Sequence, residues 1–182
     1  MSIHKFKFAL VATFAVQILL VGAMLFDRIN TINNGQEVLL QSRFVDPRDV
    51  FRGHYVRLNL IAGEINKNLP GANEKFNYRD PIYVSLTLGE KGFWVAKSVH
   101  RQLPQDDSLV ILEGVYQGKN NNTLRVRFPF DRYFADKERA LELENLHADQ
   151  KLGVVLALNG KGGGVIKGIT IDGKIIYDEP LL

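Results

Sequence analysis

Cysteine is absent from this chain of 182 residues. Its absence excludes disulfide bonds, a thiol nucleophile and every zinc or iron–sulfur site that uses cysteine ligands. It also excludes a lipid anchor attached to an N-terminal cysteine. Because chains without cysteine occur in both oxidising and reducing compartments, the location of the protein has to be inferred from its topology.

The chain also has little net charge. Its formal charge is +3, which becomes +1 when the two lysines before the first apolar run, Lys5 and Lys7, are left aside. A domain this close to neutrality is not expected to attract a polyanion. We therefore expect no nucleic-acid partner.

Motifs for catalysis or metal binding are scarce. The four histidines, His4, His54, His100 and His147, form no His-x-His or His-x-x-x-His pair, and no Gly-x-Ser-x-Gly sequence is present. Residues 160–164 (GKGGG) resemble a phosphate-binding loop but lack its spacing and do not precede a helix;. They are better interpreted as a loop between two strands, and we expect neither a metal nor a cofactor.

A long apolar run near the N-terminus predicts a membrane span. Phe8 to Phe26 forms 19 positions interrupted only by Thr13, Gln17 and Gly22, and a helix of that length covers ~28 Å, close to the hydrocarbon thickness of a bilayer. The lysines that precede it favour an N-terminus in the cytoplasm and a remaining chain outside.

A cleavable signal peptide is the competing interpretation of this run, with residues 21–23 (VGA) as the cleavage site;. The apolar run continues through Phe26, however, and exceeds the ~7–15 residues of a usual signal core. We therefore expect residues 1–28 to form a cytoplasmic tip and a membrane anchor that contacts the lipid bilayer through residues 8–26.

The rest of the chain is expected to form a polar tether, residues 29–36, and one outer domain, residues 37–182. Apolar alternation and turn residues predict a mainly β domain, a small β-sandwich or barrel, with one short surface helix over Asp136–His147;. The predicted strands cover residues 37–44, 54–62, 82–88, 92–99, 109–116, 123–130, 152–159, 165–171 and 174–177. Four hairpins are expected among these strands. In the last hairpin, between residues 165–171 and 174–177, Asp172-Gly173 suits a type I′ turn.

Two of these strands have side-chain patterns with specific consequences. In residues 82–88, Ile82, Val84, Leu86 and Leu88 are predicted to point inward, and the residues between them, including Ser85, outward;. In residues 123–130, arginines at 125 and 127 alternate with apolar residues and predict one basic face. Aromatic residues are mostly expected in the core, although Phe93 and Trp94 should point to opposite faces of their strand.

The stretch Val45–Leu60 (VDPRDVFRGHYVRLNL) is unusual because charged residues surround a proline just before a strand. Pro47 restricts Asp46 to an extended backbone, and Asp49 can accept hydrogen bonds within a turn. Two interpretations remain open: a structural corner in which Arg48 or Arg52 satisfies carboxylates and carbonyls, or a cleft that binds an anion or a peptide.

This stretch resembles the GDYXXLXY family of membrane-anchored bacterial proteins, which is named for the motif Gly-Asp-Tyr-x-x-Leu-x-Tyr. The matching positions are Val45, Asp46, Pro47, Arg48, Asp49, Phe51, Arg52, Gly53, Tyr55, Val56 and Leu58. His54 replaces the motif aspartate and Leu60 its last tyrosine. Arg132, Tyr133 and Phe134, the acidic segment after them and the end of the chain, residues 165–173, also resemble the family.

The resemblance implies a membrane-anchored bacterial protein with a single span and no particular reaction. Together with the lysines before the apolar run, it leads us to expect a single-pass protein of the bacterial cytoplasmic membrane whose C-terminal domain faces the periplasm or the cell exterior. We expect a binding module for a membrane or envelope protein. Its binding corner is expected to comprise Asp46, Pro47, Arg48, Asp49, Phe51, Arg52, Gly53, His54, Tyr55 and Leu58, with Arg132, Tyr133 and Phe134 as a second region.

Two alternative functions remain open. One is a hydrolase or lyase of envelope polymers that uses Asp46, Asp49 and His54 as acid–base groups. The other is a sensor of a small ligand or glycan that uses the aromatic and arginine side chains.

Overall fold

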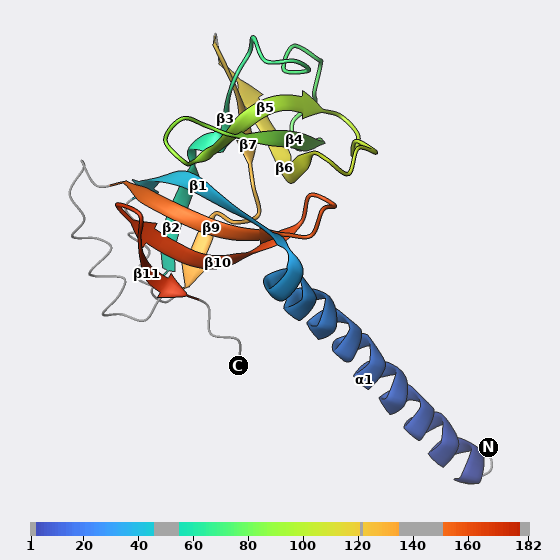
Figure 1. Cartoon of the computed structure of the whole chain (residues 1–182). Helices are drawn as coiled ribbons and strands as arrows, with labels where there is room; N and C mark the ends of the chain where they lie inside the picture. The colour runs from blue at the N-terminus through green and yellow to red at the C-terminus, as the bar shows by residue number, and fades with distance from the viewer. Residues whose placement is uncertain (1–2, 46–54, 121, 135–150, 179–182) are drawn as a thin grey trace.

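A computed structural model describes residues 3–45, 55–120, 122–134 and 151–178. Within these residues the chain forms one long helix, α1, followed by strands β1 to β11 (Figure 1). The predicted helix over residues 136–147 lies outside them.

Helix α1 (Ile3–Asn34) projects from the β domain as a single element (Figure 1). Its side chains from residue 7 to residue 28 are exposed, which suits a helix that contacts lipid;. The helix is long and apolar enough to cross a membrane. It continues through most of the polar segment after the apolar run, and β1 begins at Gln36.

The last turn of α1 packs on the domain. Thr31 and Ile32 are buried, and the helix contacts β9 and β10. Gly35 makes the junction: its N–H donates to the Thr31 carbonyl at 2.9 Å, and a Cβ atom at Gly35 would lie 2.8 Å from the Leu158 carbonyl oxygen. Helix and domain are therefore in direct contact where the chain passes from one to the other.

Two antiparallel sheets form the domain, one above the other in Figure 1. The six-stranded sheet has the order β11-β10-β9-β1-β2-β8, and the five-stranded sheet has the order β3-β7-β6-β4-β5. The strands are β1 (Gln36–Val45), β2 (Tyr55–Leu60), β3 (Glu64–Asn66), β4 (Pro81–Leu88), β5 (Trp94–His100), β6 (Val110–Lys119), β7 (Thr123–Arg127), β8 (Arg132–Phe134), β9 (Leu152–Leu158), β10 (Gly164–Ile171) and β11 (Lys174–Asp178).

One hydrophobic core lies between the sheets. Leu40, Leu156 and Ile169 enter it from the larger sheet, and Ile82 and Leu112 from the smaller one, each fully buried. Burying a side chain of this size contributes ~1.5–3 kcal/mol. The predicted mainly β architecture is therefore confirmed.

The four predicted hairpins are present: β4–β5, β6–β7, β9–β10 and β10–β11. Asp172 and Gly173 both have positive φ, 50° and 82°, as the predicted type I′ turn requires;. The loop between β9 and β10 also joins the two sheets, because the Glu113 N–H of β6 donates to the Gly162 carbonyl at 2.8 Å.

Two orientations predicted in β4 are wrong. Leu88 is 61% exposed, whereas Ser85 is completely buried. The pairing of β4 with β5 shifts register between Ser85 and Leu86, and the shift brings Ser85 opposite Ser98. The Ser85 hydroxyl lies 2.5 Å from the Ser98 hydroxyl, which lies 2.8 Å from His100 Nε2. A hydrogen-bonded chain thus satisfies a serine that alternation alone places in solvent.

Candidate functional site

The candidate site lies where two stretches of the chain each pass from one sheet to the other. β2 and β3 are separated only by a 3-10 turn, Ile61–Gly63, and β7 continues through residues 128–131 into β8. β2 pairs with β8 in the larger sheet, and β3 pairs with β7 in the smaller one. The same two stretches of chain therefore pair twice and separate in between.

The separation contains a groove of about 360 Å³, here called the β2–β7 groove. Residues from both stretches, with one residue of β6, line it: Leu58, Asn59, Leu60, Gly63, Glu64, Gln117, Arg125, Val126, Arg127, Phe128, Phe130 and Asp131. Its size is at the lower end of the range of small-ligand sites.

The walls of the groove combine an apolar base with a charged rim. Leu58, Leu60, Phe128 and Phe130 are each at most 7% exposed and belong to the core. The alternation predicted for β7 is confirmed, because Arg125 and Arg127 are exposed while Val126 between them is buried.

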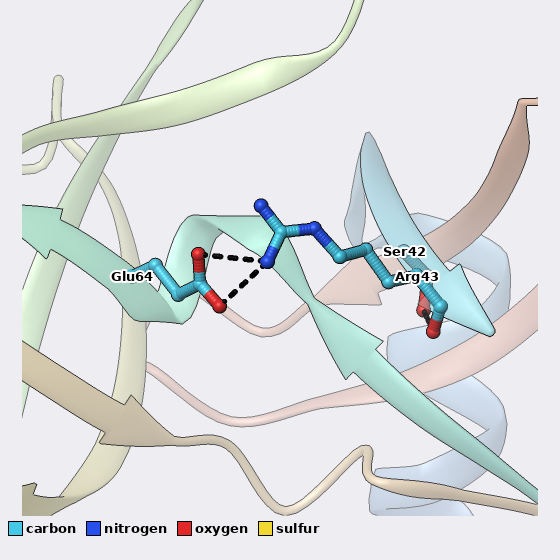
Figure 2. Close-up of polar contacts among 3 residues, drawn as sticks. All are labelled: Ser42, Arg43 and Glu64. Carbon is cyan, nitrogen blue, oxygen red and sulfur yellow. Dashed lines mark hydrogen bonds and ion pairs between the residues drawn. The ribbon is translucent and has the colours of Figure 1, made fainter. Parts of the chain in front are cut away.

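The charges on the rim are not all neutralised. Arg43 Nη1 of β1 donates to both carboxylate oxygens of Glu64, at 2.9 and 3.0 Å (Figure 2), and Asp131 also has an interaction partner. Neither Arg125 nor Arg127 makes an ion pair with any residue that the structure describes. The unbalanced charge of the rim is therefore positive.

The structure places only part of the predicted binding corner. Tyr55 begins β2, and Leu58 is buried and lines the groove. The other predicted corner residues, Asp46, Pro47, Arg48, Asp49, Phe51, Arg52, Gly53 and His54, lie outside the described residues. The interpretation of the corner as a brace or a cleft stays open, as does the acid–base role considered for Asp46, Asp49 and His54.

The second predicted region lies beside the first. Arg132, Tyr133 and Phe134 form β8, and the Cα partners Tyr55–Phe134, Val56–Tyr133 and Arg57–Arg132 pair it with the motif strand. β8 itself was not predicted, since three residues are too short for a periodic pattern.

Several groove residues carry no signal in the sequence. Glu64, Gln117 and Asp131 belong to no motif, and Asn59 occupies a variable position of the family motif. Glu64 lies in β3, another strand of three residues. The usable indications were the alternation of arginines in β7 and the motif positions Leu58 and Leu60. The groove residues lie close together because β2–β3 and β7–β8, which are distant in the chain, pass side by side from one sheet to the other.

A second cavity, here called the Trp94 pocket, shares Glu64 with the β2–β7 groove. It measures about 320 Å³, and its lining includes Gln41, Glu64, Asn66, Phe93 and Trp94. Phe93 and Trp94, for which we predict opposite faces of one strand, both contribute to this lining. Phe93 precedes β5, so the alternation of the strand does not apply to it.

Among residues with described positions, no group of three His, Asp or Glu side chains could hold a metal ion. The residues that line the β2–β7 groove carry hydrogen-bonding, positively charged and apolar side chains.

Comparison with known proteins concerns the same segments. No curated protein and no solved structure matches the chain significantly. The family model described as GDYXXLXY protein matches residues 17–169, a range that includes the end of the apolar helix, β2 and β8. This family and the apolar helix indicate a membrane-anchored protein. The strand beside the groove is thus the motif strand of its family, and the chain belongs to the GDYXXLXY proteins.

Proposed function

We propose that this protein is a single-span envelope protein whose outer β domain binds a membrane or envelope protein through the β2–β7 groove. The observation that carries the proposal is the position of the groove beside the motif strand, with two arginines on its rim that form no ion pair with a described residue. The finer location, in the bacterial cytoplasmic membrane with the domain in the periplasm or outside the cell, is part of the proposal.

The chemistry of the groove favours a partner segment with acidic side chains. A guanidinium donates up to five hydrogen bonds and can pair with a carboxylate through two parallel hydrogen bonds, in a bidentate geometry. Arg125 and Arg127 are two residues apart on one strand and therefore share a face;. The apolar base, formed in part by Leu58 and Phe128, supplies a surface for an apolar residue beside the acidic one.

The binding proposal is tested by co-purification from membranes in mild detergent. We expect the full-length wild type to retain a partner that Arg125→Gln/Arg127→Gln loses, because the carboxylates of the partner then face no cation. Arg79→Gln is the matched control, since Arg79 is exposed and lies away from the groove. Equal recovery of the partner by the groove variant, with unchanged melting temperatures, would contradict the proposal.

The proposed topology has its own test. A reporter that is active only in the cytoplasm, fused after Leu182, should be inactive, and one that is active only after export should be active. The expectation follows from the lysines before the apolar run. The reverse pair of results would place the domain in the cytoplasm and exclude an envelope partner.

A specific observation favours a second candidate, a sensor of a neutral glycan. The Trp94 pocket combines aromatic surface from Phe93 and Trp94 with the amides of Gln41 and Asn66, and amphipathic rings with a few polar groups suit a sugar. Trp94 is the single tryptophan, so tryptophan fluorescence, excited selectively over that of the tyrosines, reports on this pocket. A saturable change on titration with envelope glycan fragments would support the sensor, and an unchanged spectrum would argue against it.

A further inference from the structure

A cavity of about 450 Å³ lies between the end of α1 and the loop joining β9 to β10. Helix residues, including Asp27, Asn30 and Asn34, line one side, and loop residues, including Asn159 and Lys161, line the other. Figure 1 shows this loop near the point where α1 enters β1. We call it the Asp27–Lys161 cavity.

The helix sets the depth of this cavity relative to a membrane. Asp27 is the first residue after the apolar run, so it lies at the boundary of the hydrocarbon. At 1.5 Å per residue, Asn34 lies about 10 Å further along the helix. The headgroup region on each side of a bilayer is roughly 5–8 Å thick. Since the helix is continuous to Asn34, the cavity lies at the level of the phospholipid headgroups.

The loop that carries Lys161 is held in place. The Asn159 side-chain oxygen accepts hydrogen bonds from the N–H groups of Lys161, at 3.0 Å, and Gly163, at 3.1 Å. The Gly162 carbonyl accepts a further hydrogen bond from β6. Gly160 and Gly162 adopt positive φ, 74° and 89°, which glycine allows without strain. The backbone that positions the lysine is therefore preorganised.

The two ionisable side chains of the cavity have opposite charges. Asp27 and Lys161 are both exposed, and neither makes an ion pair within the part of the chain that the structure describes. A headgroup with a phosphate and a primary ammonium offers the complementary pair of charges. The amides of Asn30 and Asn34, already joined at 2.8 Å, can hydrogen-bond either group.

We propose that the Asp27–Lys161 cavity binds the headgroup of an aminophospholipid of the phosphatidylethanolamine type. Lys161 pairs with the phosphate and Asp27 with the primary ammonium. A purely anionic headgroup lacks the cation that Asp27 requires, and a trimethylammonium group has no N–H to donate to it. This proposal rests on the membrane anchoring in the proposed function, but it does not depend on the β2–β7 groove.

The test uses the full-length protein in phosphatidylcholine nanodiscs that contain a minor fraction of phosphatidylethanolamine or phosphatidylglycerol. Native mass spectrometry measures the lipids that the released protein retains. We expect the wild type to be enriched several-fold in phosphatidylethanolamine over the bulk composition. Asp27→Asn should abolish this enrichment, and Lys161→Gln should lower the retention of all phospholipids.

Lys91→Gln and Asp107→Asn are matched controls, because both residues are exposed and lie outside the cavity, and they should behave as the wild type. Enrichment that survives in both cavity variants overturns the proposal, as does equal retention of phosphatidylglycerol by the wild type. If the protein purified from cells has lost its apolar segment by cleavage, the proposal is also overturned, because no bilayer then lies beside the cavity. Because groove variants are not used, loss of lipid selectivity is distinguishable from failure of partner binding.

Discussion

Val56 of the motif strand and Tyr133 of β8 are Cα partners in an antiparallel pair. They come from stretches that lie far apart in the chain, and the same stretches pair again as β3 and β7 in the other sheet. Two segments within the range matched by the family model are thus neighbours in space. The groove between the two pairings is a consequence of this shared path from one sheet to the other.

The corner before the motif strand gives the first prediction. If Arg48 and Arg52 donate hydrogen bonds to buried acceptors, replacing either arginine by alanine should lower the free energy of unfolding by ~1–3 kcal/mol, because those acceptors lose their donors. Thermal melting of the full chain in detergent measures this. Unchanged melting together with loss of the co-purified partner would instead assign these arginines to binding.

The junction of helix and domain gives the second prediction. In Gly35→Ala the added Cβ would lie 2.3 Å from the Thr31 carbonyl oxygen, and backbone atoms must move to relieve this contact. We expect a loss of ~1–3 kcal/mol in stability, as for other overpacked sites, seen as a lower melting temperature. Gly22→Ala is the control, because a Cβ there has nothing within 4 Å. Equal melting of the two variants would refute the tight junction.

The ion pair between Arg43 and Glu64 gives the third prediction. Its side chains are 58% and 37% exposed, so water screens the attraction, and a double-mutant cycle with glutamine should give a coupling of only ~0.2–1 kcal/mol. The pair nevertheless joins β1 of one sheet to β3 of the other. A coupling well above this range would mean that the arrangement of the sheets depends on the pair.

Asp106 gives the fourth prediction. The hydroxyl of Ser108 donates to Asp106 Oδ1 at 2.6 Å and its backbone N–H at 3.0 Å, and these bonds, the hydroxyl first, hold the pKa of this carboxyl below its ordinary value. Because the native pKa is lowered, the stabilisation is complete above the ordinary pKa and is lost as pH falls through the native one.

The carboxyl resonance of Asp106, followed by NMR against pH, measures this pKa. Ser108→Ala removes the hydroxyl bond and should raise the pKa towards its ordinary value. An identical Asp106 titration in wild type and variant would show that the hydroxyl bond does not form in solution.

Local patterns in the sequence were sufficient for most of the strands and for their hairpins, because alternation and turn residues act between neighbours in the chain. They predicted the exposed arginines of β7 and the positive φ of the Asp172-Gly173 turn. They were misleading in β4, where a register shift in the pairing with β5 brings Ser85 into a hydrogen-bonded chain. A register shift depends on the partner strand and leaves no local pattern.

The sequence by itself therefore determined the apolar helix, the β character of the domain and the family, since each depends on composition, periodicity or a contiguous motif. Only the tertiary structure decided that β2 lies beside β8, that Glu64 and Arg127 border one groove, and that Lys161 lies opposite Asp27. These relationships depend on how the two sheets pack around one core and how the end of α1 packs on β9 and β10. Packing joins residues that are distant in the chain, so no local pattern encodes it.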